Sequence, residues 1–109
     1  MTSEADPLTL VLVGPMAAGK TSVGRRVARK LGVPFVDTDK RVVAAHGPIP
    51  AIFEQHGEAH FRALERAAVA EALGTGGVIS LGGGAVTDVA TRTLLIEHPV
   101  VFLTVSYTH

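Results

Sequence analysis

The chain has 109 residues, 47% hydrophobic and 18% charged, with ten basic and ten acidic side chains that cancel and with no cysteine. This length and hydrophobic content favour one domain with a core, which excludes a multidomain protein and a disordered one. The charge balance gives no reason to expect a nucleic acid or membrane partner, and the lack of cysteine excludes disulfides, thiolate metal sites and cysteine catalysis.

The N-terminal segment Met1-Thr-Ser-Glu-Ala-Asp-Pro7 is acidic, and the apolar run that follows it is short. This pattern fits neither a signal peptide nor a membrane span. We therefore expect a cytoplasmic protein and, further, a monomer.

Apolar runs alternate with segments of helical periodicity along the chain. From Lys20 onward, Val23, Val27 and Leu31 fall on one helix face, and Gly32 stands where a helix ends. The strand-like runs are rich in β-branched residues and almost continuously apolar. In chain order, the pattern predicts a strand over 8–13, a helix over 20–31, a strand over 33–36, short helices over 40–46 and 51–56, a helix over 58–73, a strand over 78–81, a helix over 88–97 capped by Thr87, and a strand over 100–105.

This order predicts the α/β class, as a three-layer αβα sandwich with a parallel sheet between helices. Ligands of such sheets gather at the C-terminal ends of the strands. Three predicted strands end in unusual residues, namely Gly14 to Thr21, Asp37 with Asp39, and Gly82 to Gly84. We expect these three segments to form one site.

The first segment, Gly14-Pro-Met-Ala-Ala-Gly19-Lys20-Thr21, fits the pattern of a phosphate-binding loop between a strand and a helix. Backbone N–H groups and the helix N-terminus attract phosphate oxygens, and the lysine reaches the β and γ phosphates. The Thr21 hydroxyl is suited to Mg²⁺. We therefore expect a nucleotide site here rather than an ordinary glycine-rich turn.

The second segment, Asp37-Thr-Asp39, is ambiguous by itself, because acidic residues after a strand often only cap the next helix. Beside a phosphate loop, one carboxylate can help hold a cation and the other can accept the proton of a hydroxyl nucleophile. The third segment, Gly82 to Gly84, fits a flexible turn or a close approach of the backbone to a ligand, and we favour the close approach.

Two other features have ordinary explanations. His56 and His60 have the spacing of a metal pair, but no third ligand is evident and Gly57 interrupts the turn, so surface histidines are favoured. Arg62 shares its predicted helix with glutamates and another arginine, so a solvated salt-bridge face is the default interpretation.

Together these motifs resemble the shikimate kinase family from about Leu10 to Val105. The resemblance rests on the phosphate loop followed by Thr21-Ser-Val-Gly-Arg25, Asp37-Thr-Asp39, Gly57-Glu-Ala-His-Phe-Arg62-Ala-Leu-Glu65 and Leu81-Gly-Gly-Gly84-Ala-Val. It implies a P-loop NTPase fold of the nucleoside monophosphate kinase type. It also implies phosphorylation of the 3-hydroxyl of shikimate with ATP and Mg²⁺, a step toward chorismate and the aromatic amino acids.

Carried over by position, the resemblance implies that Lys20 contacts the transferred phosphate and that Asp39 binds the substrate hydroxyls and accepts the proton. Arg62 would pair with the shikimate carboxylate, and Gly83 would hydrogen-bond the substrate. Mg²⁺ would be held by Thr21 and, through water, by Asp37. The nucleotide-binding residues would be Ala17, Ala18, Gly19, Lys20, Thr21 and Ser22.

Two departures from the family pattern affect these expectations. Ala17 stands where the family loop usually carries glycine, which would be strained if that position needed a positive φ. Family members also continue beyond the fourth strand with a lid arginine, a second substrate arginine, a fifth strand and the adenine contacts. We therefore expect residues 1–109 to be a single incomplete domain, truncated after the fourth strand and inactive by itself.

Two alternatives stay open. A small P-loop kinase similar to gluconate kinase would share the phosphate loop but should lack the combination of Gly-Glu-x-x-Phe-Arg and three glycines. A non-catalytic remnant that binds nucleotide weakly is the second alternative, because uncovered strands and helices would leave apolar surface in water.

Overall fold

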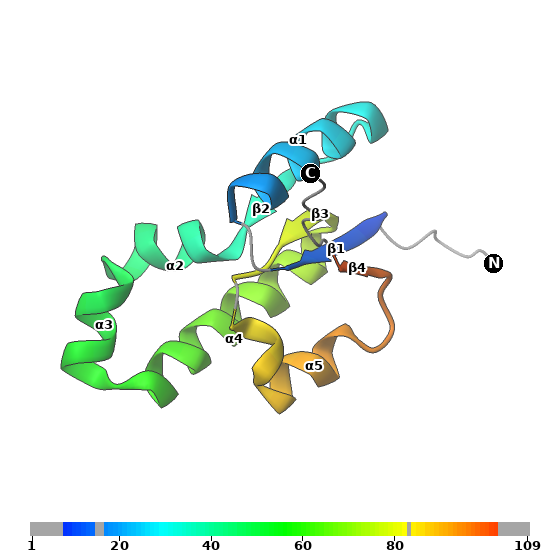
Figure 1. Ribbon diagram of the computed structural model, residues 1–109. Helices are drawn as coiled ribbons and strands as arrows, with labels where there is room; N and C mark the ends of the chain where they lie inside the picture. The colour runs from blue at the N-terminus through cyan, green and yellow to red at the C-terminus, as the bar shows by residue number, and fades with distance from the viewer. Residues whose placement is uncertain (1–7, 15–16, 83, 103–109) are drawn as a thin grey trace, which may run out of the picture.

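The computed structural model describes residues 8–14, 17–82 and 84–102, except the side chains of residues 17, 18 and 102. Strands and helices alternate along this part of the chain, as predicted (Figure 1). In chain order they are β1 (Thr9–Val13), α1 (Ala17–Leu31), β2 (Phe35–Asp37), α2 (Thr38–His46), α3 (Ile49–His56), α4 (Glu58–Thr75), β3 (Gly77–Ser80), the 3₁₀ turn η1 (Ala85–Thr87), α5 (Val89–Leu95) and β4 (Val100–Phe102).

The strands form one parallel sheet in the order β2-β3-β1-β4. In the register of this sheet, Leu12 of β1 and Asp37 of β2 both pair with Ser80 of β3. Three strands therefore end at the same edge, which is where parallel sheets hold their ligands. The predicted convergence of the three segments at one edge follows from this register.

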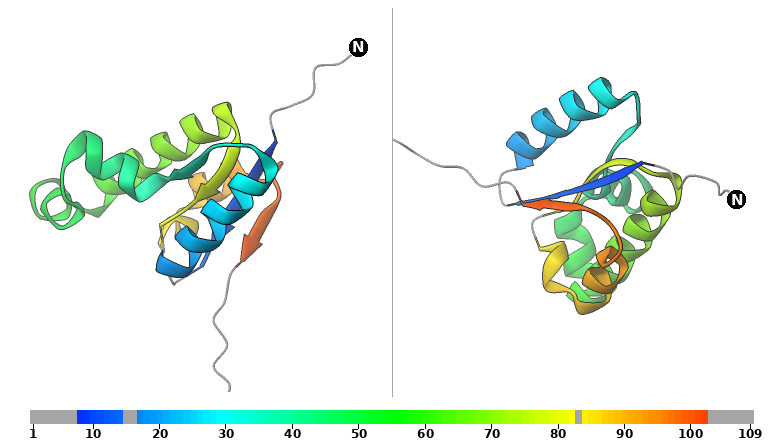
Figure 2. Two further views of the ribbon diagram at one scale, coloured as in Figure 1. Left: turned by 90° about the horizontal axis from the view of Figure 1, so that it is seen from above. Right: turned by 90° about the vertical axis from the view of Figure 1, so that its right-hand side faces the viewer.

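Helices cover both faces of the sheet. Figure 2 shows α1 on one face and α4 with α5 on the other. The strand residues alternate accordingly, since Leu12 and Val78 pack toward α1 while Val11, Val13 and Ile79 pack toward α4 and α5. The predicted three-layer αβα sandwich is confirmed.

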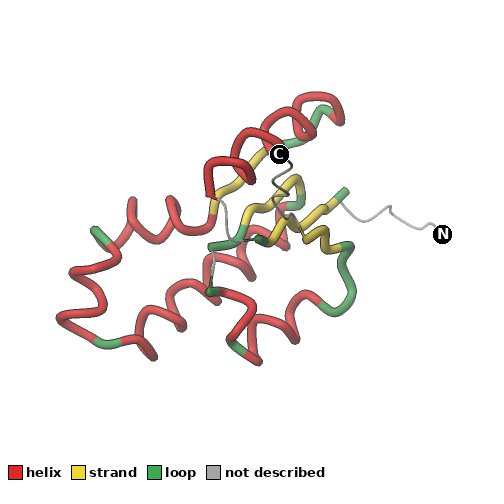
Figure 3. The backbone as a smooth tube through the Cα atoms, viewed as in Figure 1, coloured by secondary structure: helices red, strands yellow, loops and turns green. Residues whose placement is uncertain are grey.

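The helices α2, α3 and the first half of α4 extend to one side of the sheet (Figure 3). Their mutual contacts bury Val42, Ile52 and Phe61 in a small separate core. This core fixes the start of α4 near the edge of the sheet where the strands end. None of the helices in the described ranges combines the length and apolar character needed to cross a bilayer.

Some predicted boundaries were wrong. The first helix begins at Ala17 rather than Lys20, so most of the phosphate loop motif is already helical. Thr87 does not cap the last helix, because a 3₁₀ turn intervenes and the carboxylate of Asp88 accepts the capping bond from the Thr91 N–H group. In the last strand, the segment 103–105 lies outside the described residues.

Candidate active site

Lys20 of α1 forms a hydrogen bond with the residue that precedes Gly82 to Gly84, the segment called the glycine turn below. Lys20 lies near the start of α1 and is only 3% exposed. Its Nζ donates a hydrogen bond to the carbonyl oxygen of Leu81 at 2.5 Å. Leu81 directly follows β3, so the ammonium group lies between the ends of two neighbouring strands. A cation beside a helix N-terminus is suited to bind a phosphate group.

The start of α2 holds the Asp37-Thr-Asp39 segment at the same edge. Asp37 caps this helix, because its Oδ1 accepts a hydrogen bond from the N–H group of Lys40 at 3.2 Å. Thr38 is fully buried, and its hydroxyl donates to the carbonyl of Ser80 at 3.3 Å. The helix-cap interpretation is therefore correct for Asp37, and Asp39 is left to face the glycine turn.

Two glycines of the turn pack against candidate substrate-binding side chains. A Cβ atom on Gly82 would lie 2.6 Å from Oδ2 of Asp39, and one on Gly84 would lie 2.5 Å from Nη2 of Arg62. Gly84 has φ −97°, which any residue can adopt, so what favours glycine there is the close approach of the Arg62 guanidinium and not the backbone conformation. The backbone of this turn therefore lies directly beside Asp39 and Arg62.

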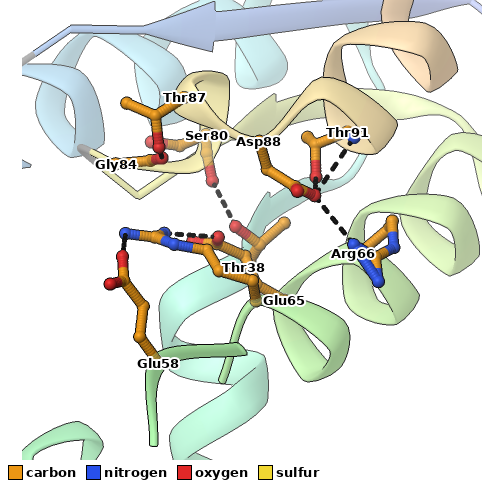
Figure 4. Close-up of polar contacts among 10 residues, drawn as sticks. Thr38, Glu58, Glu65, Arg66, Ser80, Gly84, Thr87, Asp88 and Thr91 are labelled. Carbon is orange, nitrogen blue, oxygen red and sulfur yellow. Dashed lines mark hydrogen bonds and ion pairs between the residues drawn. The ribbon is translucent and has the colours of Figure 1, made fainter. Parts of the chain in front are cut away.

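Arg62 is held by two glutamates of its own helix. Its Nη1 bonds Oε1 of Glu65 at 2.7 Å and its Nη2 lies 3.5 Å from Oε2 of Glu58; Figure 4 labels both glutamates. The guanidinium also lies over the ring of Phe61, at 5.3 Å from its centroid. The side chain of Glu65 is only 1% exposed and that of Arg62 19% exposed. The expected solvated salt-bridge face is therefore wrong for this pair, which is turned toward the interior.

The electrostatics confirm that these groups share one environment. Burial, and next the negative charge of Asp37, raise the pKa of Asp39 above its ordinary value of 3.8, while the positive charges of Lys20 and Arg62 lower it. Burial also raises the pKa of Glu65, an effect that the hydrogen bond and charge of Arg62 oppose. Both carboxyl groups thus bind a proton more readily than they would in water.

The remaining sequence-predicted residues are only partly described. Gly19, Lys20, Thr21 and Ser22 lie in the first turns of α1, and the backbone of Ala17 and Ala18 belongs to the same helix. In the described ranges no residue other than glycine has a positive φ, so the strain considered at Ala17 does not arise. Gly83, the predicted substrate donor, lies outside the described residues.

The residues predicted to hold Mg²⁺ fit such an ion by their chemistry. Thr21 supplies a hydroxyl oxygen and Asp37 a carboxylate, which are the ligands that Mg²⁺ prefers. Among the described residues no group of three or more histidine, cysteine or carboxylate side chains could hold a metal.

The histidine pair lies where α3 is followed by α4. His56 ends α3 and His60 lies in α4, with their ring centroids 4.7 Å apart. Both residues are exposed. The favoured interpretation as surface histidines agrees with this position.

Sequence reasoning missed the supporting residues of the site. The pattern assigns Glu65 and Arg66 to a solvated salt-bridge face, and it gives no role to Thr38 or Asp88. No local pattern marks a glutamate in a polar helix as buried, because its burial depends on which helix face meets the turn 82–88. A polar threonine between two aspartates likewise carries no sign that its hydroxyl bonds a neighbouring strand.

Comparison with known proteins gave a match over almost the whole chain. Residues 16–109 match the family model of shikimate kinase. A shikimate kinase of Salinispora tropica is 58% identical over 97 residues, which are 87% of this chain and 58% of that protein. The chain therefore spans less than two thirds of the length of this curated relative.

Solved structures match as well. The structure of shikimate kinase from Acinetobacter baumannii in complex with shikimate has a TM-score of 0.80 and 38% identity, and covers 92% of this chain and 57% of that one. A gluconokinase from Sinorhizobium meliloti has a TM-score of 0.60 and 26% identity over 94% of this chain and 61% of that one. The likeness to the first structure is clearly the stronger in both measures.

Proposed function

This chain belongs to the shikimate kinase family, and on this basis we propose that the protein transfers the γ-phosphoryl group of ATP to the 3-hydroxyl of shikimate. One observation carries the proposal. Asp39 and Arg62 both lie against the glycine turn at the strand ends, and Lys20 is close enough to influence Asp39. Shikimate is a small polyol with one carboxylate. It calls for one guanidinium group and a few polar groups next to a phosphate site.

Arg62 is the proposed partner of the shikimate carboxylate. Glu65 and Glu58 orient its guanidinium, and the side chain keeps 19% of its surface exposed. An arginine held in this way loses little conformational entropy when it binds a planar carboxylate through two N–H groups. The bound substrate would then lie beside Gly82 and Gly84.

Asp39 is the proposed acceptor of the proton from the 3-hydroxyl. Its raised pKa makes it a better proton acceptor than an aspartate in water, and Lys20 and Arg62 keep it ionised by their positive charges. The carboxylate touches the backbone at Gly82 and is therefore restricted in position. A fixed base next to the acceptor hydroxyl is the kind of group that positions a nucleophile for phosphoryl transfer.

Lys20 and the N-terminus of α1 are the proposed binding site of the ATP phosphates. The hydrogen bond from Lys20 to Leu81 holds the ammonium group at the strand ends in the absence of nucleotide. Thr21 and Asp37 would hold Mg²⁺, which when bound neutralises charge on the β and γ phosphates. Lys20 adds a second positive charge at the same place, where negative charge develops during transfer.

Titration calorimetry with shikimate and, separately, with gluconate tests the substrate. We expect saturable binding of shikimate with a dissociation constant below about 1 mM, and no measurable binding of gluconate. Binding of gluconate instead would support the alternative, a kinase similar to gluconate kinase. The weaker structural likeness to gluconokinase makes this alternative the less favoured one. In the protein that carries this chain, phosphorus NMR should detect shikimate 3-phosphate when ATP, Mg²⁺ and shikimate are supplied together.

A further inference from the structure

Two arginines of α4 contact the segment between β3 and α5 at two places. Arg62 lies against the α-carbon of Gly84. Arg66 donates from Nη1 to Oδ2 of Asp88 at 2.9 Å (Figure 4). The two arginines are four residues apart, so they lie on the same helix face about one turn of roughly 5.4 Å from each other. The helix thus contacts this turn at two separate points.

Asp88 is the fixed point at the far end of the turn. Its Oδ2 accepts hydrogen bonds from Arg66 at 2.9 Å, from the Thr91 hydroxyl at 2.9 Å and from the Thr91 N–H group at 3.3 Å. Thr91 is fully buried. The hydrogen bond from Thr91 and the charge of Arg66 lower the pKa of Asp88, so the carboxylate is ionised at neutral pH. One oxygen therefore caps α5 and also joins it to α4.

Hydrogen bonds connect the residues between Asp88 and the two glycines that the structure describes. The Thr87 hydroxyl donates to the carbonyl of Gly84 at 2.6 Å, and the N–H group of Ala85 donates to the carbonyl of Gly82 at 3.1 Å. Ala85 itself is fully buried in the core between the sheet and α5. A displacement of Asp88 is therefore expected to move the backbone at Gly84 and Gly82.

We propose that Arg66 and Asp88 are positioning residues of the active site, whose ion pair fixes the glycine turn against Asp39 and Arg62. The proposal rests on the proposed function only in treating those two side chains as substrate ligands. Capping α5 requires just the bonds from Thr91, so the additional bond to Arg66 serves to set the turn relative to α4. Because α4 also carries Arg62, one helix determines the positions of both the substrate arginine and the backbone beside it.

The variant Asp88→Asn separates the two tasks of Asp88. Asparagine caps helices as well as aspartate does, but it removes the charge that Arg66 binds. Arg66→Gln removes the same pair from the other side. The matched control is Glu71→Gln, which also turns a carboxylate paired with an arginine into an amide, but in the exposed Arg41–Glu71 pair with its 3.5 Å separation.

The first measurement needs no substrate. In ¹⁵N-labelled chain, we expect Asp88→Asn and Arg66→Gln to shift the amide signals of Gly82 and Gly84 and to speed hydrogen exchange at Ala85 and Thr87. The double variant should show the same change as either single one, because both remove one interaction. Unchanged glycine signals in the two single variants, or changes as large in Glu71→Gln, would overturn the proposal.

The second measurement is shikimate affinity by calorimetry. We expect both variants to bind shikimate roughly tenfold more weakly, less than the hundredfold that a misplacement of about 1 Å can cause, with ATP affinity unchanged. Equal weakening of ATP and shikimate binding would indicate general destabilisation and contradict a positioning role. If the unaltered protein that carries this chain does not bind shikimate, the proposed function fails, and the glycine signals still decide whether the pair positions the turn.

Discussion

The carboxylate of Asp39 packs against the α-carbon of Gly82 so closely that a methyl group there would overlap it, at 2.6 Å from Oδ2. Gly82 follows β3 and Asp39 lies at the start of α2, so this contact joins the ends of two neighbouring strands. The side chain of Asp39 is thereby fixed by the backbone of another strand connection. Glycine at residue 82 leaves room for the proposed catalytic base, whose carboxylate would have to shift if a Cβ atom were present.

Gly82→Ala is expected to displace Asp39 and to destabilise the chain by about 1 to 3 kcal/mol, the usual cost of forcing an extra group into a packed region. Shikimate binding should be lost in calorimetry. The control is Gly74→Ala in α4, where a Cβ atom meets nothing within 4 Å. That variant should gain about 0.5 to 1 kcal/mol from helix propensity and bind shikimate normally. Normal binding by both variants would refute the role given to this contact.

Glu65→Ala is expected to lower the free energy of unfolding by about 2 to 4 kcal/mol, because it removes the buried partner of Arg62 and leaves a cavity. The comparison is Glu58→Ala, which removes the other partner. Glu58 has an exposed side chain and lies 3.5 Å from the guanidinium, so its loss should cost less than about 1 kcal/mol. Urea unfolding of the two variants measures the difference, and similar losses would show that the burial of Glu65 does not matter.

We expect the Asp39→Asn variant to be more stable than the unaltered chain, by an amount that increases as the pH rises. Burial and the charge of Asp37 raise the pKa of Asp39 above 3.8, so the folded state binds the proton more tightly than the unfolded state does. Stability is then lost as the pH rises through the window between the two pKa values, where Asp39 ionises at a cost. The asparagine variant avoids this cost.

Thermal unfolding followed by circular dichroism from about pH 4 to about pH 7 tests this sign. The melting temperature of the Asp39→Asn variant minus that of the unaltered chain should be smallest at acid pH and should increase toward neutral pH. Other groups titrate in both chains and cancel in the difference. A difference that decreases with pH would mean that the environment favours the ionised form. The same variant should lose shikimate binding, because it lacks the carboxylate that is proposed to contact the substrate hydroxyl. A change that stabilises the chain at this residue is thus expected to impair function.

Thr21→Val is expected to remove the effect of Mg²⁺ on ATP binding while the fold is retained, since valine has the shape of threonine without the hydroxyl oxygen. Thr21→Ser keeps the oxygen and should bind as the unaltered chain does. Calorimetric titration of each chain with ATP, in Mg²⁺ and in chelator, measures the effect. A valine variant that still binds ATP more tightly with Mg²⁺ would exclude Thr21 as a ligand.

Local sequence patterns determined the fold class and the main elements. Apolar runs rich in β-branched residues marked the buried strands, and helical periodicity marked α1 and α4, because burial on one or both faces leaves a period in the sequence. The phosphate loop, Asp39 and the glycine turn were also evident, since each follows directly after a strand. Their convergence at one edge required only the rule that strand ends of a parallel sheet meet there.

Boundaries and caps were less well determined. The last helix was expected to start from Thr87, but Asp88 caps it after a 3₁₀ turn. Both residues are good N-caps, so propensity alone does not choose between them. The choice follows from the 3₁₀ turn, in which the Thr87 hydroxyl bonds the carbonyl of Gly84 and Asp88 is left at the start of α5.

Only the tertiary structure decided which polar side chains of α4 are buried. Glu58 and Glu65 both lie within one turn of Arg62 in the sequence, yet one side chain is 65% exposed and the other 1% exposed. The difference arises because α4 crosses the sheet with one face toward the turn after β3. Contacts of this kind, such as Arg62 with Gly84 and Arg66 with Asp88, join residues about twenty apart in the chain, and no local period encodes the angle at which a helix packs.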